Sequence, residues 1–208
     1  MAIITISRQL GAGEVEFTDK LTDTLGYPLY DDLLIQQVAA ALEVHTGVVR
    51  ALDERLEPGA IQGVLSRITG GRARGQVSTR REEGGVRPEI VRTALRSVVR
   101  EIARRDNAII VGRGAGIILG DLRGLLKLRL VAPLEFRARY LARTIGMNLG
   151  EAEEEVQRTD NDRRGYIRRM FNVDWEDPTL YDIVINTART DSDTAVRIVV
   201  KVMEEKKL

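Results

Sequence analysis

Cysteine is absent from this 208-residue chain, and histidine occurs once. Without cysteine the chain can form neither a disulfide nor a thiolate metal site, which fits a reducing compartment. With His45 as the single histidine, a histidine-rich metal site and a histidine-based catalytic triad are both excluded. We interpret His45 as an ordinary solvated or hydrogen-bonded side chain.

Long hydrophobic runs and an excess of one charge are also missing. No apolar run approaches the roughly 20 residues that cross a bilayer, and the apolar start at residues 1–6 is too short for a signal peptide. The 32 basic and 31 acidic side chains give a formal net charge of +1, which does not indicate a nucleic-acid binder. We therefore expect a cytoplasmic protein that binds neither membranes nor nucleic acids.

What the chain does contain is a regular alternation of short apolar runs with helical patterns. A composition of 43% hydrophobic and 30% charged residues is ordinary for one globular domain over 1–208. Strands that alternate with helices predict an α/β fold with a parallel sheet of about five strands, covered on both faces. The predicted strands are 3–6, 27–30, 107–111, 125–131 and 181–186, and the predicted helices are 14–25, 32–42, two within 47–68, 88–105, the region 134–171, and 191–206.

Residues 70–87 differ from the rest of the chain because glycines alternate with arginines there. Such a segment buries little apolar area, so we predict a mobile basic loop. Nucleic-acid binding through this loop is the weakest alternative, since no aromatic residues are interleaved with the arginines for base stacking.

Three polar features follow three of the predicted strands. Residues 7–13 follow the first strand, Asp31 and Asp32 follow the second, and Arg113 follows the third. Ligands of open parallel sheets bind beyond the carboxyl ends of the strands, so we expect these features to converge on one site.

The first of these features is a partial phosphate-binding loop. Glycines at 11 and 13 let backbone N–H groups close around phosphate oxygens at the start of a helix. In the full motif, G-x-x-x-x-G-K-[ST], Gly13 would be the second glycine. Arg8, Glu14 and Val15 then replace the first glycine, the lysine and the hydroxyl residue. Taken alone, the loop fits a phosphate site and a purely structural turn equally well.

Longer blocks carry a family resemblance that spans nearly the whole chain. Together they are similar to the cytidylate kinase-like family of P-loop proteins. The blocks are IITISRQLGAG at 3–13, LGYPLYDDLLI at 25–35, IIVGRGAGIIL at 109–119, APLEFRARYL at 132–141, and DNDRRGYIRRMF with DWEDPTLYDIVINT within 160–187.

The resemblance implies a three-layer P-loop fold with a helical, arginine-bearing lid at about 137–172. It implies an enzyme that uses ATP and Mg²⁺ to phosphorylate a nucleoside monophosphate, CMP or dCMP. A homodimer is compatible with the resemblance. The residues implied are Arg8, Arg158, Arg163 and Arg168 for catalysis, Gly11, Ala12, Gly13, Glu14 and Arg137 for ATP, and Asp31, Asp32 and Arg113 for the acceptor, with no metal ligand assigned.

Several residues keep two interpretations. Glu14 either points away from the phosphates as an exposed first-turn carboxylate or helps to hold Mg²⁺, because facing a triphosphate directly would cost about 4 kcal/mol. Arg113 matches the arginine of the related GRD segment, and the alternative is a structural ion pair. Gly114 replaces the aspartate of that segment. Glu14, Val15 and Gly114 together motivate the alternative of a catalytically degenerate nucleotide-binding regulatory or scaffold protein.

Two further interpretations concern side chains that could serve packing instead of chemistry. One of Asp31 and Asp32 could cap the helix that follows. Trp175 and Tyr181 are interpreted as packing residues and not as base-stacking residues.

Overall fold

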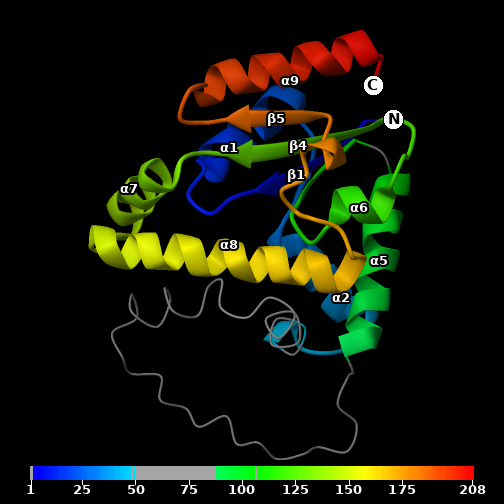
Figure 1. Cartoon of the computed structure of the whole chain (residues 1–208). Coiled ribbons are helices and arrows are strands. Elements are labelled where there is room, and N and C mark those ends of the chain that lie inside the picture. The colour runs from blue at the N-terminus through cyan, green and yellow to red at the C-terminus, as the bar shows by residue number, and fades with distance from the viewer. Residues whose placement is uncertain (1, 48, 50–87, 106) are drawn as a thin grey trace, which may run out of the picture.

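The structure is a computed structural model that describes residues 2–47, 49, 88–105 and 107–208 (Figure 1). The predicted loop at 70–87 lies outside the described residues, and so do nearly all of the two helices predicted within 47–68. No helix in the described part is both long and apolar enough to span a membrane.

All five predicted strands form, and they pair in parallel in the order β2-β3-β1-β4-β5. Helices connect them and cover both faces, which confirms the predicted three-layer α/β architecture. The elements are β1 (Ile3–Arg8), α1 (Glu14–Leu25), β2 (Leu29–Tyr30), α2 (Asp32–Ala41), α5 (Pro88–Arg104), β3 (Ala108–Val111), α6 (Ala115–Leu119), β4 (Leu125–Val131), α7 (Leu134–Ile145), α8 (Leu149–Phe171), a 3-10 turn (Pro178–Leu180), β5 (Ile183–Asn186) and α9 (Ser192–Lys206).

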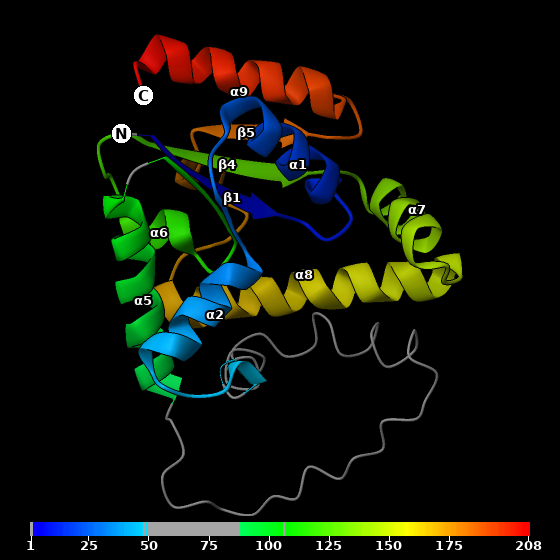
Figure 2. The same cartoon turned by 180° about the vertical axis from the view of Figure 1, so that it is seen from behind.

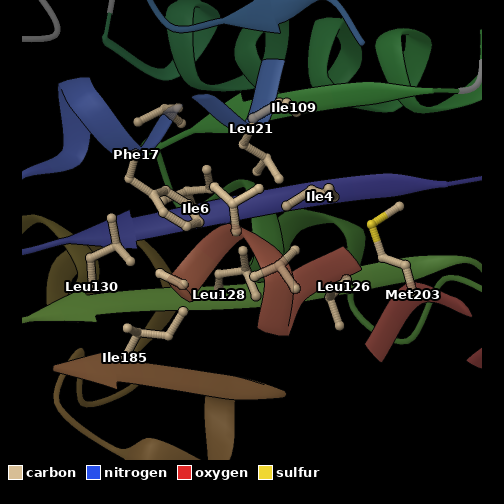
Figure 3. Packing of buried hydrophobic residues seen from close by; sticks show 14 of the residues in the cluster. Ile4, Ile6, Phe17, Leu21, Ile109, Leu126, Leu128, Leu130, Ile185 and Met203 are labelled. Atoms are coloured by element: carbon tan, nitrogen blue, oxygen red, sulfur yellow. The ribbon is translucent and has the colours of Figure 1, made fainter. Parts of the chain in front are cut away.

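One face of the sheet is apolar throughout and is covered by α1 and α9 (Figures 1 and 2). Alternate residues of the central strands point into this layer, as the period of two requires. Phe17 and Leu21 of α1 and Met203 of α9 close over them (Figure 3). Helix α9 thus buries Ala195, Val196, Val199 and Met203 against the sheet, whereas Val15 of α1 is 60% exposed.

The other face is covered by α2, α5 and α6 on the β3 side, and α8 runs along the same side of the sheet (Figures 1 and 2). Ile3, Ile110 and Leu125 pack beneath these helices. Helix α6 is absent from the sequence prediction, because its five residues are too short to display a helical period.

The region predicted as helical over 134–171 is two antiparallel helices, α7 and α8. Helix α7 stops at Gly146, whose φ of 77° lies in the left-handed region that glycine adopts easily. Asn148 is the N-cap of helix α8, and its side chain accepts a hydrogen bond from the Glu151 backbone N–H at 2.8 Å. The two helices thus form a hairpin beside the carboxyl end of the sheet (Figure 1).

A buried ion pair fastens this hairpin to the loop after β1. Arg137 Nη1 of α7 lies 2.6 Å from Asp160 Oδ2 of α8, and both side chains are buried. The two side chains also bind the backbone of Leu10, because Arg137 donates to its carbonyl at 3.1 Å and its N–H donates to Asp160 at 3.0 Å. Gly11 lies so close that an added Cβ would be 2.6 Å from the Arg137 carbonyl oxygen. The loop is therefore held by both helices at once.

Removing the carboxylate from this pair should destabilise the protein strongly. Asp160→Ala leaves the Arg137 guanidinium buried without its counter-charge and frees the Leu10 N–H, so we expect a loss of about 3–5 kcal/mol in the free energy of unfolding by urea denaturation. The matched control is Glu135→Ala, which breaks the exposed Glu135–Arg139 pair on α7 and should have little effect. Equal stabilities for the two variants would contradict this role of the pair.

Candidate active site

The carboxyl ends of β1 and β3 bring Arg8 against Gly112. The two strands pair in register from Ile3 to Ile6, so the residues that follow them are neighbours. A Cβ at Gly112 would collide with Arg8 Nη1, which means that the guanidinium passes directly over the Gly112 backbone. Arg8 Nη2 lies 3.6 Å from Asp31 Oδ2, after β2. Two of the three predicted features therefore contact each other at this edge of the sheet.

Asp31 occupies the N-cap position of α2 without a capping hydrogen bond from its side chain. Among the described residues it forms an ion pair with Arg8, so the capping alternative is not what the structure shows for Asp31. Asp32 begins α2, and its side chain lies outside the part that the structure describes.

Arg113 has an unusual backbone conformation. Its φ is 54°, and its neighbours Gly112 (75°) and Gly114 (66°) also have positive φ, so three successive residues are left-handed. This conformation costs a non-glycine residue on the order of 1 kcal/mol, and such residues concentrate at functional sites. The turn directs Arg113 into the wall of a cleft.

Arg163 of α8 reaches the same cleft from the opposite side. Its Nη1 donates a hydrogen bond of 3.0 Å to the Arg8 carbonyl oxygen. Arg8, Arg113 and Arg163 all line the cleft, together with the Gly114 turn. The loop after β1, the turn after β3 and the predicted lid segment thus each bring one arginine to a single cleft.

The other arginines singled out in the sequence do not line this cleft. Arg158 forms a bidentate pair with Glu155 at 2.6 and 2.7 Å and approaches Asp162 at 3.4 Å. Arg168 is exposed near the end of α8. The Arg137 guanidinium is used in the buried ion pair with Asp160 and in the hydrogen bond to the Leu10 carbonyl. Catalytic roles for Arg158 and Arg168, and an ATP contact for Arg137, stay predictions.

The loop after β1 leaves two polar atoms without partners. Gly13 is left-handed, with φ of 71°, and precedes Glu14, the first residue of α1. Among the described residues, no hydrogen-bond partner contacts the buried atoms Glu14 Oε2 and Arg8 Nε. Glu14 is half-buried, so the exposed-carboxylate alternative does not describe it. An unpaired buried group costs about 1–3 kcal/mol, which makes this loop a place where a ligand can add favourable contacts.

A buried network that the sequence analysis missed forms one wall of the cleft. Arg129 of β4 is 3% exposed, and its guanidinium carbon lies 4.1 Å from the centre of the Trp175 ring system. Arg129 Nη1 donates to the Trp175 carbonyl at 2.6 Å and to the Tyr181 hydroxyl at 3.0 Å. Trp175 Nε1 donates to Ser7 Oγ at 2.8 Å. The interpretation of Trp175 and Tyr181 as packing residues agrees with these contacts. The sequence did contain a signal for this network, because Lys127 and Arg129 alternate with leucines in β4.

The absence of a carboxylate at position 114 has a structural reason. A Cβ at Gly114 would lie within 2.7 Å of the Phe171 ring, at the end of α8, and the φ of Gly114 is positive. An aspartate there would displace Phe171 and strain the backbone. The packing of α8 on the Arg113 turn thus disfavours an aspartate at position 114.

Comparison with known sequences gives a consistent result. A sequence model described as the cytidylate kinase-like family matches residues 3–189. Cytidylate kinase from Thermococcus kodakarensis is 33% identical over 112 residues, which are 54% of this chain and 56% of that protein. Cytidylate kinase from Methanopyrus kandleri is 32% identical over 107 residues, 48% of this chain and 55% of that protein. The chain spans just over half the length of these relatives.

Solved structures resemble the fold over the whole chain. An uncharacterized protein from Eubacterium ventriosum superimposes with a TM-score of 0.67 at 19% identity, covering 98% of this chain and 99% of that one. Shikimate kinase from Acinetobacter baumannii gives 0.52 at 13% identity, covering 100% and 96%. These likenesses show the fold of the P-loop kinases, and the sequence match over 3–189 shows that the chain belongs to the cytidylate kinase-like family.

Proposed function

We propose that this protein transfers the γ-phosphoryl group of ATP to a nucleoside monophosphate, CMP or dCMP. The observation that carries the proposal is the meeting of Arg8, Arg113 and Arg163 at one cleft beyond the carboxyl ends of the strands. Guanidinium groups suit phosphates because their planar fork makes paired, charge-assisted hydrogen bonds. The names of the relatives, cytidylate kinases, support the choice of acceptor.

We propose a role for each part of the site. Backbone N–H groups at Gly11 and Gly13, with the positive end of α1, would hold the ATP phosphates, whereas the Ala12 N–H donates to the Gln9 carbonyl at 3.2 Å and would shape the loop. Arg113 would hold the acceptor phosphate, and its oxygen would attack the γ-phosphorus in line as ADP leaves. Arg8 and Arg163 would neutralise the negative charge on the transferred phosphoryl group and on the donor and acceptor phosphates on either side of it. Catalysis would thus come from positioning and charge neutralisation.

The residues present fit a Mg²⁺ ion that is brought by the nucleotide. No group of three or more acidic or histidine side chains able to hold a metal occurs among the described residues. Mg²⁺ in phosphoryl-transfer sites usually needs only one or two carboxylates besides the phosphates. Glu14, with its buried and unpaired Oε2, is the carboxylate that we propose would hold the ion. The ion would neutralise phosphate charge and so remove the repulsion between Glu14 and a triphosphate.

A second candidate function is nucleotide binding without turnover. It is favoured by Glu14 at the position of the P-loop lysine and by Phe171, which blocks a carboxylate at position 114. A protein of this kind would sense a nucleotide or assemble with a partner.

The two candidates differ in turnover, which a coupled assay measures directly. With ATP, Mg²⁺ and a panel of CMP, dCMP, UMP and AMP, we expect ADP formation that depends on the acceptor and is fastest with CMP or dCMP. No product above background with any acceptor would overturn the kinase proposal. Calorimetric binding of a nucleotide in that case would favour the second candidate.

Arg113 should be needed for activity without being needed for folding. Asparagine tolerates the left-handed conformation, so Arg113→Asn should change the free energy of unfolding by less than about 1 kcal/mol. The loss of charged hydrogen bonds should lower kcat/KM for the acceptor about ten- to a hundredfold. Arg113→Lys should recover only part of this, because lysine lacks the fork. Arg197→Asn, on exposed α9, is the matched control, and an equal loss of activity there would contradict the assignment.

Glu14 should set the dependence on Mg²⁺. Glu14→Gln keeps the size of the side chain but removes its charge, so the Mg²⁺ concentration for half-maximal activity should rise several-fold. Glu16→Gln, two residues further along α1, removes an exposed carboxylate and should leave this concentration unchanged. The same Mg²⁺ dependence in the wild-type protein and Glu14→Gln would show that Glu14 does not hold the ion.

A further inference from the structure

Four polar side chains lie together on one face of the two central strands. In the pairing of β1 with β4, Thr5 is opposite Lys127 and Ser7 is opposite Arg129. Residues two apart on a strand point to the same face, so the four form a block two strands wide and two positions long. Thr5, Ser7 and Lys127 line the cleft of the candidate active site.

Such a block is unexpected in the middle of a parallel sheet. Strands buried on both faces are ordinarily apolar on both, and here the opposite face obeys the rule with Ile4, Ile6, Leu126 and Leu128, each at most 1% exposed. Polar groups removed from water cost free energy unless they are paired, and sites that break a local rule are often functional. The hydrogen-bond partners of the two cross-strand pairs, Ser7–Arg129 and Thr5–Lys127, therefore indicate whether the block is structural or binds a ligand.

The Ser7–Arg129 half is paired within the protein. Ser7 Oγ accepts from Trp175 Nε1, and Arg129 is bound by the Trp175 carbonyl and the Tyr181 hydroxyl. The Trp175 ring covers the Arg129 guanidinium. This half needs no ligand to satisfy it.

The Thr5–Lys127 half is open. Thr5 is 4% exposed, and its hydroxyl makes no hydrogen bond within the described part of the chain. The Lys127 side chain is 21% exposed, and among the described residues its ammonium forms one ion pair, with Asp121 at 3.5 Å, and is attracted more weakly by the Asp182 carboxylate. Asp121 is fully exposed to solvent, so this ion pair holds the ammonium only weakly. The Thr5 hydroxyl and the Lys127 ammonium thus lie side by side on the cleft wall, and few protein groups contact their polar atoms.

We propose that Thr5 and Lys127 bind the end of the acceptor substrate that lies away from its phosphate, and that the group they recognise is a carbonyl oxygen of its base. This inference rests on the proposed function for the identity of the ligand. An ammonium only donates hydrogen bonds, so its partner must be an acceptor, and a pyrimidine carbonyl supplies one. No role for Lys127 followed from the sequence pattern.

The position of the pair supports this division of the cleft. Arg8 follows Thr5 by three residues along β1, which places the arginine rim roughly 10 Å from the Thr5–Lys127 pair. The three arginines at the rim suit the phosphate, and the pair at the inner end suits an uncharged acceptor group. The cleft would therefore bind the phosphate of a nucleoside monophosphate at its rim and the base at its inner end.

Two shape-preserving variants, Lys127→Met and Thr5→Val, test the proposal by calorimetric titration with CMP and, separately, with inorganic phosphate. Lys127→Met should weaken CMP binding about ten- to a hundredfold, the effect of losing a charged hydrogen bond, and leave phosphate binding within twofold. Thr5→Val should weaken CMP binding several-fold. It should not lower the melting temperature, because the hydroxyl that it removes makes no hydrogen bond within the described part of the chain. A purely structural role for Thr5 predicts a lower melting temperature.

Lys201→Met, on exposed α9, is the matched lysine control and should bind CMP as the wild type does. Unchanged CMP affinity in Lys127→Met, equal losses for CMP and phosphate, or no binding of CMP by the wild-type protein would each overturn the proposal. Because binding is measured without turnover, a protein that fails the kinase assay but binds CMP through Lys127 would refute the proposed activity and still support this inference.

Discussion

The buried pair between Arg137 and Asp160 is the interaction on which the arrangement of the site depends. It joins α7 to α8 and holds both backbone polar groups of Leu10, in the loop that follows β1. Helix α8 is thereby fixed at the edge of the sheet where Arg163 can reach the Arg8 carbonyl. A charge pair in a dry environment is a costly way to join elements, but it ties three distant segments with one geometry. The loop after β1, Arg8 and Arg163 are therefore held in place by contacts within the protein itself.

The candidate site is also where the chain departs from the rules that govern the rest of the fold. Arg113 adopts a conformation that favours glycine, Glu14 and Arg8 each bury an unpaired atom, and Lys127 stands on a sheet face that should be apolar. Each departure has a free-energy cost that a bound polyanion or its base could offset. Arg8, Arg113 and Lys127 line the same cleft, while the opposite face of the sheet is uniformly apolar, which makes this cleft the candidate site on physical grounds.

The sequence was enough to predict the sheet and the meeting of Arg8 with the Arg113 turn, because parallel strands bring the segments that follow them to one edge. It could not rank the arginines of α8. Arg158, Arg163 and Arg168 are five residues apart, and five residues turn a helix by about 500°, so successive members of the series point about 140° apart. Arg163 therefore faces away from the other two, whereas Arg158 and Arg168 lie only about 80° apart. Which side of α8 faces the cleft depends on how the Arg137–Asp160 ion pair sets the rotation of the helix. The fold alone does not assign a chemical role to any of these side chains, so their roles are proposals.

Hydrogen exchange measured with and without CMP plus a non-hydrolysable ATP analogue tests the central claim most directly, because it reports where ligand contacts form. The account predicts slower exchange of backbone amides in residues 9–14 and 112–117, at the loop after β1 and the turn after β3, and no change in α9. Protection confined to other segments, or no protection at either loop at saturating ligand, would contradict it.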